Sequence, residues 1–191
     1  MLNIILAGAR SETTDELEKG IQQCGYQIIS KVNLNVNLAS LLEQHTIDAI
    51  IINVEIPDQY ILDQMKNINA VKPIPIIMFS EKANDDAIEA VVNAGVSAYV
   101  VNGLSRTRVK SIVDTAIVRF RTVKATQDEL KKAKNSLNER KQIDRAKGMI
   151  MRHSKIGEEE AYKTLRKMAM DSNKRIAKMA EDIVNVFKGL P

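Results

Sequence analysis

The stretch that decides the fold of the first half of the chain is DAIIINVEIP, residues 48–57. Its run of apolar residues, followed by polar Asn53 and a turn at Pro57, is typical of a strand buried on both faces of a parallel sheet. Similar runs recur, and the five predicted strands are Asn3–Ala7, Gln27–Val32, Ala49–Asn53, Pro75–Phe79 and Ser97–Val101. Helical patterns lie between them, as at Thr14–Cys24 and Asp85–Ala94. These βα repeats predict an α/β fold with a doubly wound parallel five-stranded sheet.

A long helix follows the fifth predicted strand. Its apolar stripe takes on the three-four spacing of heptads, with core positions at Phe120, Val123, Gln127, Leu130, Lys134 and Leu137. This spacing predicts a coiled coil that pairs two chains into a homodimer, and polar Gln127 and Lys134 weaken the coil while restricting its register. A single amphipathic helix packed on its own chain is the alternative.

The last part of the chain has the pattern of three helices. The long helix is predicted to continue to about Ser154, and a second helix to begin at Gly157, where glutamates favour the positive end of the helix dipole. Asp171 or Ser172 is expected to cap a third helix. The predicted organisation is an α/β domain over residues 1–111, a coiled-coil linker over 112–137 and an all-α domain over 138–191.

Charge is divided unevenly along the 191 residues. Residues 1–120 hold 10 Lys and Arg against 14 Asp and Glu, whereas residues 121–191 hold 18 against 10. A basic second half joined to an acidic first half indicates that the second half meets a polyanion.

Several classes of function lack the residues that they need. Cys24 is the single cysteine, which excludes an internal disulfide and a cysteine-rich zinc module and suits a reducing cytoplasm. With two histidines, no glycine-rich phosphate loop and no nucleophile motif, we expect neither an enzyme nor a metal or other cofactor. No apolar run approaches the roughly 18 residues of a membrane span, so no membrane is expected as a partner.

The first half resembles the receiver domain of two-component response regulators, through its five repeats, the 48–57 string and Ser80 at the end of the fourth strand. In that family the third strand ends in an Asp that accepts phosphate, two acids after the first strand hold Mg²⁺, and a Lys follows the fifth strand. The matching positions here are Asn53, the segment Ala-Gly-Ala at 7–9, and Asn102.

An amide cannot attack phosphorus as a carboxylate does, and Mg²⁺ needs anionic oxygen ligands. The resemblance therefore implies a pseudo-receiver that is not phosphorylated and that serves as a docking or dimerisation platform. A rearranged pocket using Glu55 or Asp58 is the alternative.

The tail resembles the ANTAR domain. ERKQIDRAKGMIM at residues 139–151 and EEEAYKTLRKMAM at residues 158–170 match that family's A-K-G-x-(I/L)-M core and its E-x-A-(F/Y)-x-x-L-R-x-x-A-M block, at the right separation. Within that group, GVSAYVVNGL at residues 95–104 is similar to NasT-type regulators of nitrate and nitrite assimilation.

This resemblance implies an antiterminator. ANTAR proteins bind stem-loops in the leader of a nascent transcript, so that a terminator does not form and RNA polymerase, an indirect partner, reads through. An inhibitory sensor protein of the NasS kind is the implied controlling partner. The candidate RNA-binding residues are Lys147, Arg166, Arg140, Lys141, Arg145, Arg152, Ala146, Gly148 and Tyr162.

Some of these residues have two interpretations. Ala146 and Gly148 allow close approach either of a partner or of a neighbouring helix, and Tyr162 is either a ring that stacks on RNA or part of the core. For the whole chain, a DNA-binding response regulator and a protein-interaction scaffold with a merely solubilising tail are the alternatives.

Overall fold

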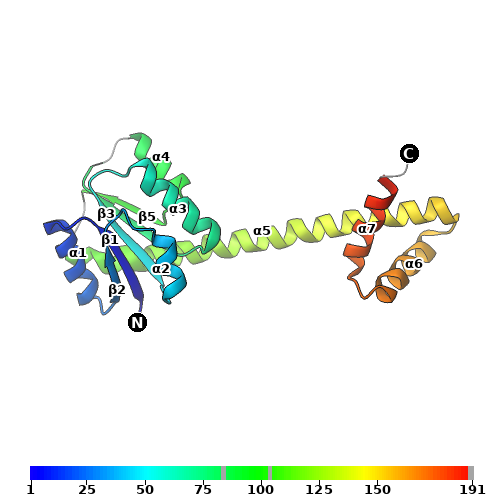
Figure 1. Cartoon of the computed structure of the whole chain (residues 1–191), viewed down its shortest axis with the longest axis horizontal. Coiled ribbons are helices and arrows are strands. Elements are labelled where there is room, and N and C mark those ends of the chain that lie inside the picture. Colours follow the sequence, from blue (N-terminus) through cyan, green and yellow to red (C-terminus); the bar gives the residue numbers. More distant parts are fainter. Residues whose placement is uncertain (83–84, 103–104, 189–191) are drawn as a thin grey trace. The chain divides into compact units, whose positions relative to one another are not determined.

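The computed structural model describes residues 1–82, 85–102 and 105–188 (Figure 1). Gly103 and Leu104, the end of the 95–104 string, therefore lie outside the described residues. The chain divides into two compact units, Met1–Lys124 and Ala125–Pro191. Each unit is described by itself below.

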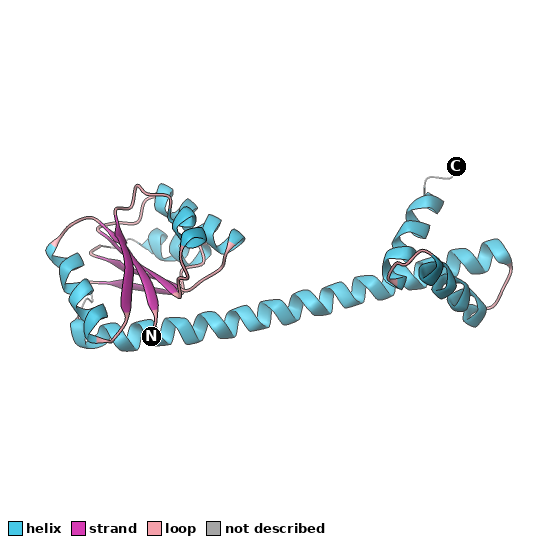
Figure 2. Ribbon diagram, turned by 60° about the horizontal axis from the view of Figure 1, so that its bottom comes forward, coloured by secondary structure: helices cyan, strands magenta, loops and turns pink. Residues whose placement is uncertain are grey.

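The first unit is the predicted doubly wound sheet (Figure 2). Its parallel strands run in the order β2-β1-β3-β4-β5. Their bounds are β1 Asn3–Gly8, β2 Gln27–Val32, β3 Ala49–Val54, β4 Ile76–Ser80 and β5 Ala98–Val101. The helices are α1 Glu12–Gln23, α2 Leu38–Gln44, α3 Gln59–Val71, α4 Asp85–Asn93 and the beginning of α5, which spans Arg106–Ser154.

The position of β3 in the sheet explains why its sequence is an apolar run. Ile50 and Ile52 lie in the core under α2, α3 and α4, whereas Ala49 and Ile51 lie in the core under α1 and α5. Because successive side chains of a strand point to opposite faces, a strand covered on both faces needs apolar residues at every position.

The register of the strands brings their polar ends to one edge of the sheet. Gly8 pairs with Asn53, Val54 with Ser80, and Ser80 with Val101. Residues that follow the carboxyl ends of parallel strands are those that meet ligands in such folds.

Helix α5 supplies part of the core of the first unit. Val113, Ala116 and Ile117 are buried against the sheet, although they lie in the segment 112–137 that the sequence assigns to the linker. The residues that follow differ, since every residue from Ala125 to Lys141 is exposed. Leu130 is 54% exposed and Leu137 53%, so no other part of the described chain covers these two heptad positions.

The second unit is all helical, as predicted. It consists of the end of α5, α6 (Glu158–Asp171) and α7 (Ile176–Lys188), and Gly157 is the N-cap of α6 as expected. Its core is made by Ala146, Ile150, Ala161, Leu165, Ala169, Met179, Ala180, Ile183 and Val184.

The start of the third helix differs from the prediction. Asp171 is the last residue of α6 and Ser172 its C-cap, so neither caps α7. Asn173 has a φ of 50°, and the Lys174 amide donates to the Ala169 carbonyl at 2.8 Å. A left-handed residue followed by such a backbone hydrogen bond is a common way to end a helix. Asp171 and Ser172 therefore belong to the C-terminus of α6.

No helix within the described residues is long and apolar enough to cross a membrane.

Candidate nucleic-acid interface and receiver pocket

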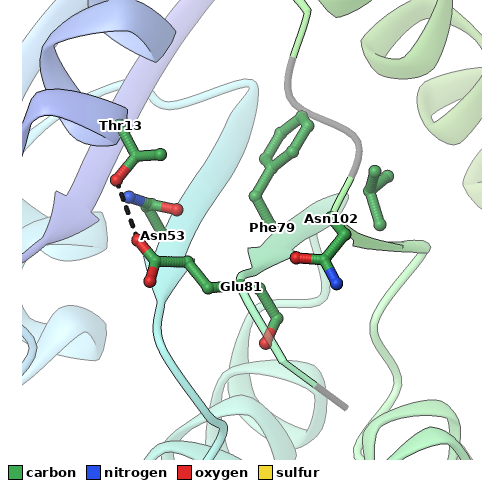
Figure 3. A pocket seen from close by; sticks show the side chains of 7 residues that line it. Thr13, Asn53, Phe79, Glu81 and Asn102 are labelled. Carbon is green, nitrogen blue, oxygen red and sulfur yellow. Dashed lines mark hydrogen bonds between the residues drawn. The ribbon is translucent and has the colours of Figure 1, made fainter.

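The carboxyl edge of the sheet holds a small pocket of about 240 Å³ (Figure 3). Asn53, Ser80 and Asn102, the three positions predicted from the receiver resemblance, all line it. Thr13 and Glu81 also line it, and the Thr13 hydroxyl donates to Glu81 Oε1 at 3.0 Å. The fold thus brings the three predicted positions together at one edge of the sheet.

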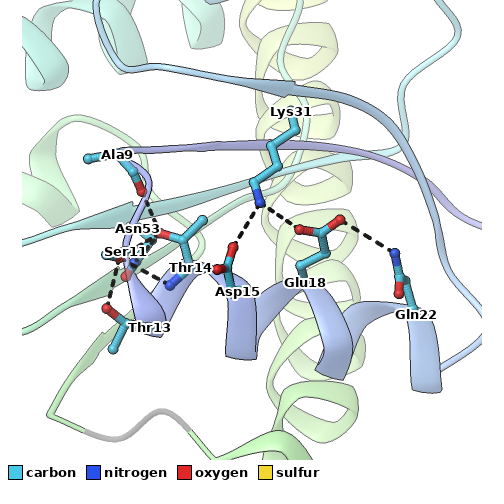
Figure 4. A network of polar contacts seen from close by, with 9 residues as sticks. All are labelled: Ala9, Ser11, Thr13, Thr14, Asp15, Glu18, Gln22, Lys31 and Asn53. Carbon is cyan, nitrogen blue, oxygen red and sulfur yellow. Dashed lines mark hydrogen bonds and ion pairs between the residues drawn. The ribbon is translucent and has the colours of Figure 1, made fainter.

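Asn53 is held by a hydrogen-bond chain that requires a donor at this position (Figure 4). Its Nδ2 donates to Thr14 Oγ1 at 2.9 Å, and Thr14 Oγ1 donates to the Ala9 carbonyl at 2.8 Å. Because the single proton of the fully buried Thr14 hydroxyl is used on Ala9, that hydroxyl can only accept from residue 53. Sequence reasoning did not single out Thr14, which lies 39 residues from its partner.

Of the other positions of a phosphate-accepting pocket, the acidic pair is replaced and the hydroxyl residue, Ser80, is kept. A side chain at Gly8 would meet the Asn53 carbonyl oxygen at 2.9 Å, so β1 leaves no room for an acid there. The Ser80 hydroxyl lies within hydrogen-bonding distance of the carbonyls of Glu55 (2.9 Å) and Lys82. The Ser80 hydroxyl thus holds the loop after β4 in place.

Glu55 and Asp58 do not form the alternative pocket. Glu55 pairs with Lys82 at 2.7 Å, and the hydrogen bond from this ammonium lowers the pKa of the carboxyl. The Asp58 carboxylate accepts from the Ile61 amide at 2.8 Å and caps α3. Neither residue lines the cavity. Among the described residues, no group of three or more His, Cys, Asp or Glu is placed to hold a metal ion.

The second unit carries many cations, and they fall into two groups. Four lysines form ion pairs with carboxylates, namely Lys147, Lys163, Lys174 and Lys178. Others have no ion pair within the described part of the chain, and these are Lys131, Lys132, Lys134, Arg140, Lys141, Arg145, Arg152, Lys155, Arg166, Lys167 and Arg175. Unpaired cations are the ones that can bind phosphates without first giving up a partner.

Three of the unpaired cations form a stripe along α5, which we call the basic stripe: Lys141, Arg145 and Arg152. Their spacing of four and seven residues places them within about 40° of one another around the helix. Arg140 lies about 100° from Lys141 and so points elsewhere. Gly148 lies on the same side of the helix as the basic stripe.

The two small residues of the A-K-G motif have different roles. Ala146 is completely buried and packs in the core of the second unit, so it serves helix packing. Gly148 is different, because a Cβ built there would meet no atom within 4 Å. The fold of the chain does not need a glycine at this position, although a mid-helix glycine costs about 1 kcal/mol relative to alanine. The open backbone at Gly148 remains available to a partner.

Lys147 is the first of the RNA-binding candidates from the sequence, and it forms ion pairs within its own chain. Its side chain is 16% exposed, and Nζ lies 2.9 Å from Asp144 Oδ1 and 2.7 Å from Glu158 Oε1. The hydrogen bond to Glu158, and then that to Asp144, raise the pKa of Lys147. This lysine ties α5 to the first turn of α6.

Helix α6 presents Tyr162 and Arg166 one turn apart. Tyr162 is 43% exposed, so its ring lies outside the core, and Arg166 is exposed as well. The neighbouring Lys163 pairs with Glu159 at 2.7 Å. A ring and a free guanidinium on one face suit the stacking and phosphate contacts of RNA recognition.

A receiver-like sheet with a pocket at its strand ends, followed by a separate helical unit, defines a two-domain regulator. Residues 4–114 match the response regulator receiver domain, and residues 131–184 match the ANTAR domain. The chain belongs to the response regulators that join a receiver domain to an ANTAR domain.

Relatives agree with this assignment. The chain is 26% identical over 172 residues to the transcriptional regulatory protein PdtaR of Mycobacterium tuberculosis, covering 90% of this chain and 84% of that protein. It is 41% identical over 58 residues to the nitrate regulatory protein of Klebsiella oxytoca, which is 30% of this chain and 15% of that protein. A response regulator from Thermotoga maritima has the same receiver fold, with a TM-score of 0.52, 16% identity and coverage of 62% of this chain and 99% of that one.

Proposed function

We propose that this protein is a transcription antitermination regulator that binds stem-loops of a nascent leader RNA through residues 138–191. The observation that carries the proposal is the basic stripe with the open Gly148 beside it, because it lies within the ANTAR match. Cations on one side of a helix contact the phosphates, and an exposed backbone lets the RNA come close.

The proposed RNA contacts are ordered by whether each side chain is already paired within the chain. Arg145, Arg152, Lys141 and Gly148 on α5, with Arg166 and Tyr162 on α6, form the direct surface. Arg140 contacts RNA from another side of α5. Lys147 positions the turn between α5 and α6, since its ammonium group already pairs with Asp144 and Glu158. Paired stems hide their base edges in a deep groove, so the bases read are the unpaired ones of the loop.

Control is proposed to come from a partner protein and not from phosphorylation. The receiver acts as a docking platform, and an inhibitory sensor of the NasS kind masks the chain until its signal releases it, by differential affinity for two states. The match to a nitrate regulatory protein supports nitrate and nitrite assimilation genes as the target.

The residues of the heptad stripe are proposed to pair two chains. Phe120, Val123, Gln127, Leu130, Lys134 and Leu137 are the predicted contacts, and three of these apolar side chains are more than half exposed: Val123, Leu130 and Leu137. Burying them against a second copy removes apolar surface from water at about 25 cal/mol per Å². Two chains would then present two RNA-binding units.

We expect the dimer to depend on Leu130. Leu130→Glu places a charge in the proposed apolar seam and should convert a dimer at micromolar concentration into a monomer. Analytical ultracentrifugation measures this, with Ser136→Glu, an exposed position between heptad positions, as the matched control that stays dimeric. A wild-type protein that sediments as a monomer with and without RNA contradicts the pairing.

We also expect the receiver to ignore phosphodonors. Acetyl phosphate and beryllofluoride should leave the wild type unchanged, and Asn53→Asp should remain unphosphorylated because residues 7–9 provide no carboxylate for Mg²⁺. Phosphate incorporation is measured by gel shift and acid lability. An acid-labile acyl phosphate at one per wild-type chain disproves this prediction.

Transcription in vitro tests the function itself. A template is built in which a hairpin bound by the chain overlaps one strand of an intrinsic terminator, and bacterial RNA polymerase transcribes it. The chain should raise readthrough in proportion to hairpin occupancy, and a template with a scrambled hairpin is the control. Binding without any change in readthrough would leave an RNA-binding protein that is not an antiterminator.

A further inference from the structure

A groove of about 360 Å³ lies on the second unit between α5 and the beginning of α7. Three carboxamide residues of α5 line it, Asn135, Asn138 and Gln142, and Arg175 lies at the other wall. We infer that this groove takes one unpaired nucleobase of the RNA, an inference that rests on the proposed RNA-binding function.

Gln142 is the residue that points to a ligand. Its Oε1 is buried and has no hydrogen-bond partner. A buried acceptor left unpaired costs free energy, and such groups in native proteins call for an explanation. The terminal torsion of a glutamine is soft, so the carboxamide can rotate, which exchanges the places of its nitrogen and oxygen and turns the oxygen toward the groove that the side chain lines. A bound group with an N–H donor would then satisfy it.

The charges of the groove favour a base over a phosphate. Lys178 and Glu181, which also line it, pair with each other at 2.8 Å. Glu139 and Arg175 remain, so the cavity has no net positive charge and includes a carboxylate that would repel a phosphate. A neutral planar ring whose edge carries both donors and acceptors matches amides, a carboxylate and a guanidinium, as base edges do.

The groove adjoins the basic stripe. Asn138 precedes Arg145 by seven residues and Gln142 precedes it by three, so both lie within about 60° of Arg145 around the helix. A strand whose phosphates lie along Lys141 and Arg145 would thus have the groove within reach of a base that is turned out of the loop. The stripe supplies affinity, and the groove supplies discrimination between bases.

The experiment uses the full chain and a synthetic hairpin with a fixed GC-rich stem and eight randomised loop nucleotides. Bound and unbound RNA are sequenced for the wild type, for Gln142→Ala and for Arg145→Ala. Gln142→Ala should abolish the base preference at one loop position and bind the unsorted pool within about twofold of the wild type. Arg145→Ala should bind every sequence about tenfold more weakly, as expected when a charged hydrogen-bond donor is removed, and keep the preferences.

A melting curve separates this role from a structural one. Gln142 accepts no hydrogen bond through its buried oxygen, and alanine is the better helix former, so Gln142→Ala should have a Tm equal to or above that of the wild type. Unchanged preferences in Gln142→Ala, or a wild type that binds the pool without preferring any base, overturn the base site while RNA binding stands. A wild type that binds none of the hairpins overturns both proposals.

Discussion

Gly148→Ala should stabilise the second unit and weaken RNA binding at the same time. Alanine is about 1 kcal/mol more favourable than glycine inside a helix, and the new methyl group meets no atom of the chain. The Tm of this unit should rise by about 4–8 °C, the usual shift for a domain of this size. The same methyl group occupies the space proposed for RNA, so affinity for a hairpin should fall about tenfold, or about 1.4 kcal/mol.

Gly157→Ala is the matched control for this variant. Gly157 also has open space around its missing Cβ, but it is the N-cap of α6 and is not part of α5, which carries the basic stripe. Alanine is a poor N-cap, so this variant should be less stable and keep its RNA affinity. Equal affinity of Gly148→Ala and the wild type for every hairpin tested would show that the exposed backbone has no part in binding.

Removing Arg145 and Arg152 together should have the largest effect on affinity. Each guanidinium has no ion pair within the described residues, and a hydrogen bond to a charged group contributes about 1.5–3 kcal/mol. The double alanine variant should therefore bind hairpin RNA about 100-fold more weakly or worse. The slope of log K against log salt should become shallower by about 1.4, because each phosphate that the protein neutralises contributes about 0.7 to it.

Lys163→Ala controls for the removal of positive charge in general. Its ammonium group is already paired with Glu159 at 2.7 Å, so removing it should change affinity and salt slope very little. Fluorescence anisotropy titrations between 50 and 300 mM salt, roughly the range over which such interactions are screened, measure both quantities. An equal decrease in Lys163→Ala and in the arginine variant would point to a diffuse charge effect and not to a defined surface.

The features of the fold that depend on periodicity and composition could be predicted from the sequence. The apolar run of β3 identified a sheet covered on both faces, and it also located Asn53 at the edge where the pocket lies. The heptad spacing identified a helix face that no part of the described chain covers at Leu130 and Leu137.

Contacts between distant segments could not be predicted in the same way. Lys147 reads as a free cation until α6 brings Glu158 to within 2.7 Å of its ammonium group. The amide at Asn53 matches a hydroxyl whose proton is committed elsewhere, a fact that depends on Thr14 and Ala9. Asp171 and Ser172 are good N-cap residues, but α6 extends through one of them and ends at the other.

Recognition of RNA by the second unit is the central claim, and a direct comparison of RNA with DNA tests it. The full chain is titrated with a hairpin RNA selected for binding, with the same sequence as a DNA hairpin and as duplex DNA, at one salt concentration. We expect the RNA hairpin to bind at least about 100-fold more tightly than either DNA, because loop bases and 2′-hydroxyls are read in addition to phosphates. Equal or tighter binding of the duplex DNA would contradict the claim and would favour a DNA-binding response regulator.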